Sequence, residues 1–206
     1  MTAKAPRRGR PPSVAKGEAI LEAATDVFLE EGFGGAGVDV IAAAAGVSKQ
    51  TVYSRYADKE ALFLAVVEAA RTEGAGIDGF GLVGATDLRV ALVELGERLL
   101  GIMLTPRVTA FRRLIIAEAG RRPWLRELWN VGGPDVTLAA LTGQLAEVLD
   151  APDPGRAARQ YLALLGHEAN MRSHYGVVEL DPAQRREIAD EAADMIVRAY
   201  GRGNGS

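Results

Sequence analysis

Apolar residues recur along this chain with the period of an α-helix and not with that of a β-strand. Between residues 17 and 31 they return at helical spacing until Gly32 interrupts the pattern, and leucines repeat in the same way up to Met103. No segment alternates apolar and polar residues convincingly enough for a strand. The pattern predicts an all-α protein with about nine or ten helices and no internal repeat.

Capping residues and prolines indicate where the later helices begin. Thr105 followed by Pro106 has the order of cap and first-turn proline that helices prefer, and either Thr86 or Asp87 can cap the leucine-rich helix. After the first helix, the predicted helical segments are 39–45, a short one from 48, 58–73, 86–103, one from 105, 124–129, 134–149, 154–175 and 182–200.

The two short segments on either side of Gly46 predict a helix-turn-helix. The first, residues 39–45, is so rich in alanine that a second helix can cross it closely. Ser48 is placed to cap that second helix, with Val47 and Val52 at the positions of a hydrophobic staple. The staple directs Val52 inward and leaves the polar side chains outward.

Four polar or aromatic residues occupy the first turn and a half of this second helix, namely Lys49, Gln50, Thr51 and Tyr53. In a helix-turn-helix the second helix enters the major groove with its N-terminal residues against base edges and phosphates. Glutamine can pair with adenine, lysine with guanine, and threonine with a thymine methyl or a phosphate. The segment therefore predicts double-stranded DNA as the partner.

Charge is distributed unevenly, although the net charge is only −3. The first 16 residues hold cations and no acid, whereas the remainder of the chain is acidic overall. The cations of this arm are Lys4, Arg7, Arg8, Arg10 and Lys16. A local basic footprint matters more for nucleic-acid binding than the total.

Other classes of function are excluded or disfavoured by what the sequence lacks. There is no cysteine, which excludes disulfide scaffolds, zinc fingers and thiol nucleophiles, and there are only two histidines. Phosphate-loop, Glu-x-x-His and Gly-x-Ser-x-Gly motifs are absent as well, so we expect no enzyme, no metal and no cofactor. No signal peptide is evident, and the longest apolar run, residues 40–45, is too short to span a membrane. We expect a cytoplasmic protein without a membrane partner.

The stretch FGGAGVDVIAAAAGVSKQTVYSRYADKEAL, residues 33–62, resembles the TetR/AcrR-type transcriptional regulators. The three prolines, the glycine and the clustered arginines of residues 1–15 predict a basic flexible arm. The resemblance implies a three-helix DNA-binding domain (16–62) and a larger helical domain for effector binding and dimerisation (63–206). It places Lys49, Gln50, Thr51 and Tyr53 on the recognition helix, and Tyr53 and Lys59 at phosphate-contact positions. The residues expected to bind DNA are Arg7, Arg8, Arg10, Ser48, Lys49, Gln50, Thr51, Tyr53, Tyr56 and Lys59.

Two departures from the family pattern affect these expectations. Ala36-Gly37 stands where the family usually has Thr-Ser, so a hydroxyl that could cap the helix and touch phosphate is missing. A glycine cap costs only a few tenths of a kcal/mol relative to serine, so the fold is expected to tolerate it. Tyr56 replaces the usual phenylalanine as a half-buried aromatic residue.

Lys59 and the arm each have two interpretations. Lys59 begins a helix, where the macrodipole prefers anions, and it either binds a phosphate together with the helix end or is simply solvated. Arg-Gly-Arg-Pro, at residues 8–11, resembles the core of an AT-hook that enters the minor groove. Alternatively, the arm adds only sequence-independent phosphate affinity.

The larger C-terminal part is expected to enclose an apolar or aromatic effector. Flexible and aromatic side chains could line the pocket, although such residues also build ordinary cores. Glu118 continues an apolar face and needs a partner, which Arg122 could supply as a purely structural pair. His167 and Asn170, on one helix, could polarise a ligand or simply be satisfied at a surface. The pocket candidates are Met103, Phe111, Leu114, Ile115, Glu118, Trp124, Trp129, His167 and Asn170.

The last two helices carry apolar stripes wide enough to pair with a twofold mate in a four-helix bundle. The alternative is that each stripe is buried within its own subunit. The interface candidates are Tyr161, Leu162, Leu165, Ala169, Ile188, Ala192, Met195 and Ile196.

The sequence therefore predicts a homodimeric, sequence-specific DNA-binding regulator, a repressor that an apolar or aromatic small molecule releases from a palindromic operator. The alternative is a nonspecific or architectural DNA-binding protein that uses the basic arm.

Overall fold

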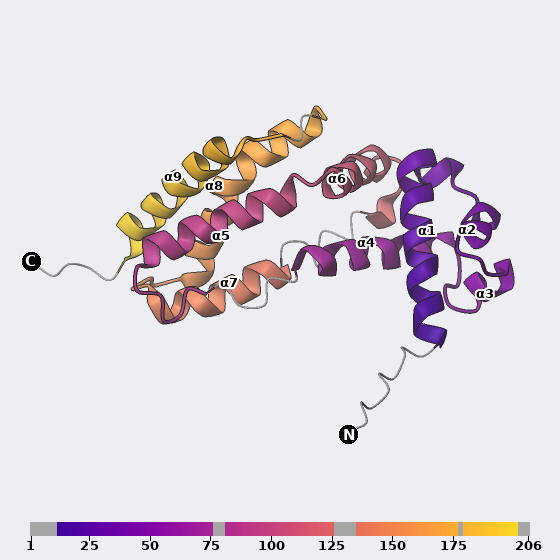
Figure 1. Ribbon diagram of the computed structural model, residues 1–206, viewed down its shortest axis with the longest axis horizontal. Helices are drawn as coiled ribbons and strands as arrows, with labels where there is room; N and C mark the ends of the chain where they lie inside the picture. Colours follow the sequence, from indigo (N-terminus) through magenta and orange to yellow (C-terminus); the bar gives the residue numbers. More distant parts are fainter. Residues whose placement is uncertain (1–11, 76–80, 126–134, 177–178, 202–206) are drawn as a thin grey trace, which may run out of the picture. The chain divides into compact units, whose positions relative to one another are not determined.

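The computed structural model describes residues 12–75, 81–125, 135–176 and 179–201, and all regular structure within these ranges is helical. The helices are α1 (Pro12–Gly35), α2 (Val38–Ala44), α3 (Lys49–Tyr53), α4 (Lys59–Ala75), α5 (Leu88–Met103), α6 (Pro106–Ala119), α7 (Asp135–Val148), α8 (Pro154–His174) and α9 (Pro182–Tyr200). The all-α prediction is confirmed, with nine helices in the described part (Figure 1). None of the described helices has the length and apolarity needed to cross a membrane.

The chain divides into two compact units, Met1–Arg71 and Thr72–Ser206. In the first unit, α1 is interrupted where the sequence pattern ends, because Gly32 has a φ of 71° that only glycine adopts without strain. The break returns Phe33 to the core, where its ring stacks on Phe28 at 5.8 Å and meets Phe63 of α4 edge-on at 5.3 Å. This aromatic cluster joins α1 to α4.

The start of α1 differs from the expectation. The helix begins at Pro12 and not near residue 17, so residues 12–15 are helical where an arm was expected. Proline has a backbone angle suited to the first turn of a helix, and no glycine or further proline lies between it and Lys16. Arg7, Arg8 and Arg10 lie outside the described residues.

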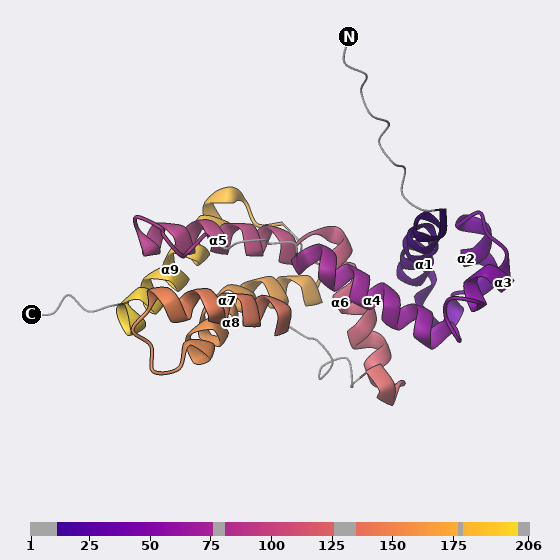
Figure 2. The same ribbon diagram turned by 90° about the horizontal axis from the view of Figure 1, so that it is seen from below.

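The second unit is built around α5, which packs along α9, while α7 packs along α8 (Figures 1 and 2). Its core contains leucines from α5, α7 and α8 and alanines from α8 and α9. The helices begin at the predicted caps, because Asp87 and Thr105 accept hydrogen bonds from Val90 and Val108. Between Pro123 and Leu125 there is a single 3₁₀ turn, and the rest of the segment expected to be helical there lies outside the described residues.

Helices α5, α8 and α9 approach one another closely at Gly96. A Cβ added at Gly96 would lie 2.8 Å from the Cβ of Ala189 and 2.9 Å from the hydroxyl of Tyr161. The Tyr161 hydroxyl, fully buried, donates a hydrogen bond to the carbonyl of Leu92. Glycine and alanine therefore set the spacing of these helices, and one buried polar contact fixes their register.

Candidate nucleic-acid interface

The turn between α2 and α3 has the geometry of a helix-turn-helix. Gly46, with a φ of 65°, ends α2, and Val47 donates its N–H to the carbonyl of Ala42. Ser48 caps α3 by accepting the N–H of Thr51 at 3.1 Å, as predicted. Val52, only 1% exposed, anchors the helix from beneath. These contacts hold the first turn of α3 in one orientation.

The outer face of α3 carries the polar and aromatic residues that the sequence predicts there. Lys49, Gln50 and Tyr53 are exposed and Thr51 is half-buried. The side-chain amide of Gln50 has no hydrogen-bond partner among the described residues. Its amide can therefore both donate and accept at an adenine edge without breaking a contact within the protein.

The hydroxyls of Ser48 and Thr51 are partly engaged, since they share a hydrogen bond of 2.8 Å. A hydroxyl has one donor and two acceptor positions, so Ser48, which also accepts the Thr51 N–H, retains one of them and Thr51 retains two. Their first role in this structure is to fix the start of α3.

Lys49 is engaged with a residue that the sequence pattern did not single out. Its Nζ donates to a carboxylate oxygen of Asp39, in the first turn of α2, at 2.8 Å. This hydrogen bond and the negative charge of Asp39 raise the pKa of Lys49 above its ordinary value. The two residues are ten positions apart across a turn, a separation that helical periodicity does not connect.

Lys59 has contacts within the protein instead of being simply solvated. Its Nζ donates to the carbonyl of Ala36 at 2.9 Å and to that of Gly34 at 3.5 Å, and it lies 4.9 Å from the centre of the Phe33 ring. The positive end of α4 is met by Asp58, which accepts the N–H of Ala61. Lys59 therefore ties α4 to the segment that precedes α2.

Gly37 and Tyr56, the two positions that depart from the family pattern, behave as expected. Gly37, at the cap of α2, supplies no side-chain hydrogen bond, as its replacement of a hydroxyl residue implies. Tyr56 is half-buried, and burial raises the pKa of its hydroxyl, an effect that the charge of Arg55 partly offsets. Tyr56 thus belongs more to the packing of the unit than to its outer face.

The candidate effector residues do not share one environment. Phe111 is buried, whereas Met103, Leu114, Ile115 and Trp124 are half-buried. His167 and Asn170 are exposed on α8, and Trp129 lies outside the described residues.

Glu118 is buried, as its place on the apolar face of α6 predicts. It accepts a hydrogen bond of 2.9 Å from Nε of Arg122. This is the structural pair that the sequence left open as an alternative.

A hollow of about 790 Å³ in the second unit opens between α5 and the start of α9, and it was not anticipated from the sequence. None of the candidate effector residues that the structure describes lines it. Its lining consists of Gly81, Ala91, Glu94, Glu97, Arg98, Gly101, Pro182 and Arg185. The charged side chains among them make it more polar than the pocket that was expected.

The predicted dimer stripe needs correction, because most of it is packed inside the subunit. Tyr161, Leu165 and Ala169 are 0% exposed, and Ala192 and Ile196 are 2% exposed. They are buried because α8 and α9 turn these faces towards α5, where Gly96 admits them closely. Of the remaining three, Met195 is 56% exposed, and Leu162 and Ile188 are half-buried.

A helix-turn-helix that exposes hydrogen-bond donors on its second helix, joined to a larger helical unit, defines the class of DNA-binding transcriptional regulators. Comparison with known proteins identifies the family within this class. Residues 20–66 match the family described as bacterial regulatory proteins of the tetR family, and residues 90–202 match the AefR-like transcriptional repressor C-terminal domain. The chain belongs to the TetR family of transcriptional regulators.

Solved structures agree with this assignment over nearly the whole chain. A TetR-family transcriptional regulator from Mesorhizobium loti MAFF303099 is 30% identical, with a TM-score of 0.82 over 93% of this chain and 100% of the other. The flavonoid-responsive regulator FrrA is also 30% identical, with a TM-score of 0.74 over 91% of this chain and 97% of the other.

A curated relative matches over a shorter segment. The HTH-type transcriptional regulator YdeS of Bacillus subtilis (strain 168) is 45% identical over 58 residues, which is 28% of this chain and 29% of that protein. The match thus spans less than a third of that relative's length.

Proposed function

We propose that this regulator binds a palindromic operator as a homodimer, in the cytoplasm, and that a small, largely apolar or aromatic effector releases it. The observation that supports DNA reading is the exposure of Gln50 in the first turn of α3. Its side-chain amide has no hydrogen-bond partner among the described residues, and Val52 of the same helix is buried. Held on a rigid turn, such an amide can make the bidentate contact with adenine that discriminates between bases. Catalysis forms no part of this role.

Dimerisation would use the apolar side chains that α8 and α9 leave at the surface. Met195 and Met171 are 56% and 45% exposed, and Leu162 and Ile188 are only half-buried. Methionine and leucine side chains repack readily against a second copy, and a twofold dimer presents the same surface twice. Two recognition helices related by such an axis fit half-sites about one helical turn apart.

The effector site is proposed to use half-buried apolar side chains, namely Met103 of α5, Leu114 and Ile115 of α6, and Trp124, which follows α6 in the chain. The likeness to an AefR-like repressor domain supports repression as the mode of regulation. The name of the relative FrrA, which describes a flavonoid-responsive regulator, supports an aromatic ligand. Binding of the effector would weaken operator affinity by favouring another spacing of the recognition helices.

The test begins with selection of bound sequences from a library of random duplexes by the wild-type protein. Fluorescence anisotropy then compares the selected duplex with a shuffled duplex of the same composition across a salt series. We expect a palindromic consensus, two protomers per duplex and discrimination of about a thousandfold or more. Gln50→Ala should lower affinity for the selected duplex by about tenfold and leave the shuffled duplex almost unaffected.

Equal binding to both duplexes, falling together with salt, would instead identify a nonspecific DNA-binding protein. Flavonoids serve as the first effector probes on the selected duplex. An aliphatic carboxylate of similar mass serves as their matched control.

A further inference from the structure

The segment that reads DNA has no net charge. Between Val38 and Tyr53, which covers α2, the turn and α3, the charged residues are Asp39 and Lys49. These two side chains form an ion pair at 2.8 Å. The positive charge of the recognition helix is therefore neutralised within the protein.

The pair lies at the surface, where DNA would also meet it. The side chains of Lys49 and Asp39 are 49% and 73% exposed. Gly37, which precedes α2, offers no side chain between Asp39 and an approaching phosphate. An aspartate in this position would repel phosphates unless a cation stayed beside it.

Neutralisation has different effects on the two kinds of DNA contact. Sequence-independent affinity comes from cations that replace the counterions of phosphates, and a lysine that remains paired with aspartate replaces none. A base edge requires hydrogen bonds and no net charge. The ammonium group has three N–H donors, so Lys49 can keep Asp39 and still donate to O6 and N7 of guanine.

We propose that Asp39 is a specificity-determining positioning residue, which holds Lys49 for base reading and prevents it from adding to sequence-independent phosphate binding. The inference rests on the proposed DNA-reading role of α3. It goes beyond that role by assigning a function to an acid on the other helix of the motif.

The experiment uses the full-length protein with Asp39→Asn, Lys49→Ala and the double variant. The probes are the duplex selected by the wild-type protein and its shuffled counterpart, measured between 0.05 and 0.2 M salt, a range of about fourfold over which a single phosphate contact is readily detected. Asp26→Asn is the matched control, because Asp26 is an exposed acid of α1 that has no ion-pair partner among the described residues. Asp39→Glu tests whether a conservative carboxylate restores the wild-type behaviour.

Asp39→Asn should bind the shuffled duplex about 60-fold more tightly at 0.1 M salt, with a salt slope steeper by about 1.8, as expected for one additional phosphate contact from each protomer of the dimer. Affinity for the selected duplex should change much less, so the discrimination ratio falls by a similar factor. In the Lys49→Ala background the same substitution should have little effect. Asp26→Asn and Asp39→Glu should keep the ratio close to that of the wild-type protein.

Three outcomes would overturn the inference. The first is an unchanged ratio and slope in Asp39→Asn with the fold intact by circular dichroism. The second is an equal gain with and without Lys49, which would show that Asp39 only repels DNA at long range. The third is a wild-type protein that does not discriminate at all, which overturns the proposed function and the inference together. The first two overturn the inference alone.

Discussion

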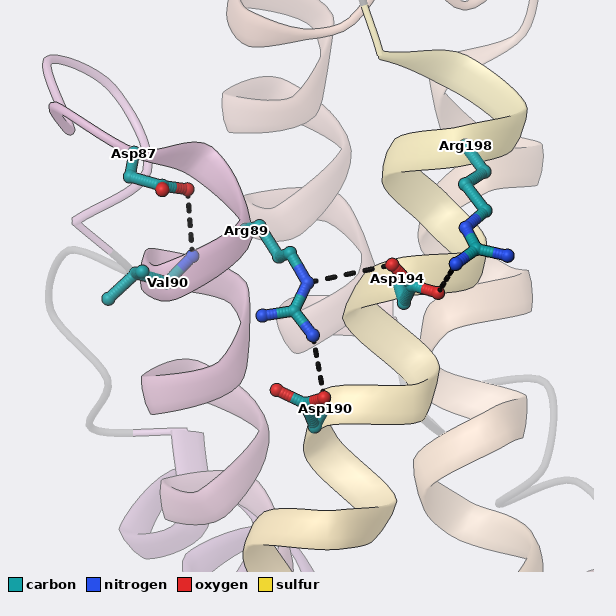
Figure 3. Close-up of polar contacts among 6 residues, drawn as sticks. All are labelled: Asp87, Arg89, Val90, Asp190, Asp194 and Arg198. Carbon is teal, nitrogen blue, oxygen red and sulfur yellow. Dashed lines mark hydrogen bonds and ion pairs between the residues drawn. The ribbon is translucent and has the colours of Figure 1, made fainter.

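Ion pairs are used differently in the two units of this protein. In the first unit the pair Lys49–Asp39 joins α3 to α2 at an open surface, where its side chains are 49% and 73% exposed. In the second unit three of the pairs form a chain along α5 and α9. Arg89 contacts Asp190 at 2.6 Å and Asp194 at 3.6 Å, and Arg198 contacts Asp194 from the other side (Figure 3).

The two sets of ion pairs differ in their surroundings, one following a packed helix contact and the other lying at an open surface. The chain of charges follows a packed contact of glycine and alanine, which would hold α5 to α9 without it. Exposed ion pairs contribute little to stability, so packing at Gly96 should decide the strength of this contact. Lys49 and Asp39 are 49% and 73% exposed, so their pairing is available to control what binds.

The largest expected effect comes from filling the contact at Gly96. Gly96→Val would place side-chain carbons where Ala189 and the Tyr161 hydroxyl already lie within 3 Å of a Cβ. We expect the free energy of unfolding to fall by about 3 kcal/mol, because helices this close must separate. Denaturant titration followed by circular dichroism measures the change.

The matched control for this substitution is Gly143→Ala, in α7, where an added Cβ meets no atom within 4 Å. It should raise the free energy of unfolding by about 0.5–1 kcal/mol through helix propensity alone. Equal losses at the two glycines would show that spacing at Gly96 does not govern the packing of α5 and α9.

The intermediate effect concerns a polar contact inside the DNA-binding unit. Lys59→Met keeps the apolar stem but removes the hydrogen bonds to the carbonyls of Ala36 and Gly34. We expect a loss of about 1.5 kcal/mol in the free energy of unfolding, whereas Lys16→Met, an exposed site on α1, should change it little. Unchanged stability with a salt slope reduced by about two, one for each protomer of the dimer, would instead show that Lys59 serves DNA phosphates and not the fold.

The smallest effect is expected at Tyr161. Tyr161→Phe removes the hydrogen bond to the Leu92 carbonyl and should lower the free energy of unfolding by about 1 kcal/mol at pH 7. Burial raises the pKa of the Tyr161 hydroxyl well above its ordinary value near 10, so the unfolded chain ionises first as pH rises. Stability from this group is therefore complete below about pH 10 and declines above it.

The measurement is denaturant unfolding of both proteins from pH 7 to pH 11. The difference between them should shrink above about pH 10, because phenylalanine does not ionise. A difference independent of pH would show that Tyr161 is accessible to solvent in the folded state.

Much of the fold follows from local patterns. The caps at Asp87, Thr105 and Ser48 and the breaks at Gly32 and Gly46 were predictable, because each depends on residues only a few positions apart. The inward direction of Val52 followed from the hydrophobic staple in the same way. Local sequence patterns thus predicted which side chains of α3 are exposed.

Contacts between helices could not be predicted in this way. Periodicity showed that α8 and α9 each have an apolar stripe, but it could not show that α5 covers Tyr161 and Leu165 instead of a second subunit. The pairing of Lys49 with Asp39 crosses a turn, and Lys59 binds main-chain carbonyls that every residue carries. Such contacts depend on crossing angles, which sequence spacing does not specify.

The tight contact at Gly96 also limits how the second unit can diversify. Residue 96 admits almost no other side chain, whereas Glu94, on the same helix, is exposed and lines an open hollow, so it can be exchanged without disturbing the helix spacing. Substitutions would therefore accumulate around the hollow long before they reach the contact beneath it. A descendant of this chain could acquire a new chemical environment on α5 while inheriting its architecture unchanged.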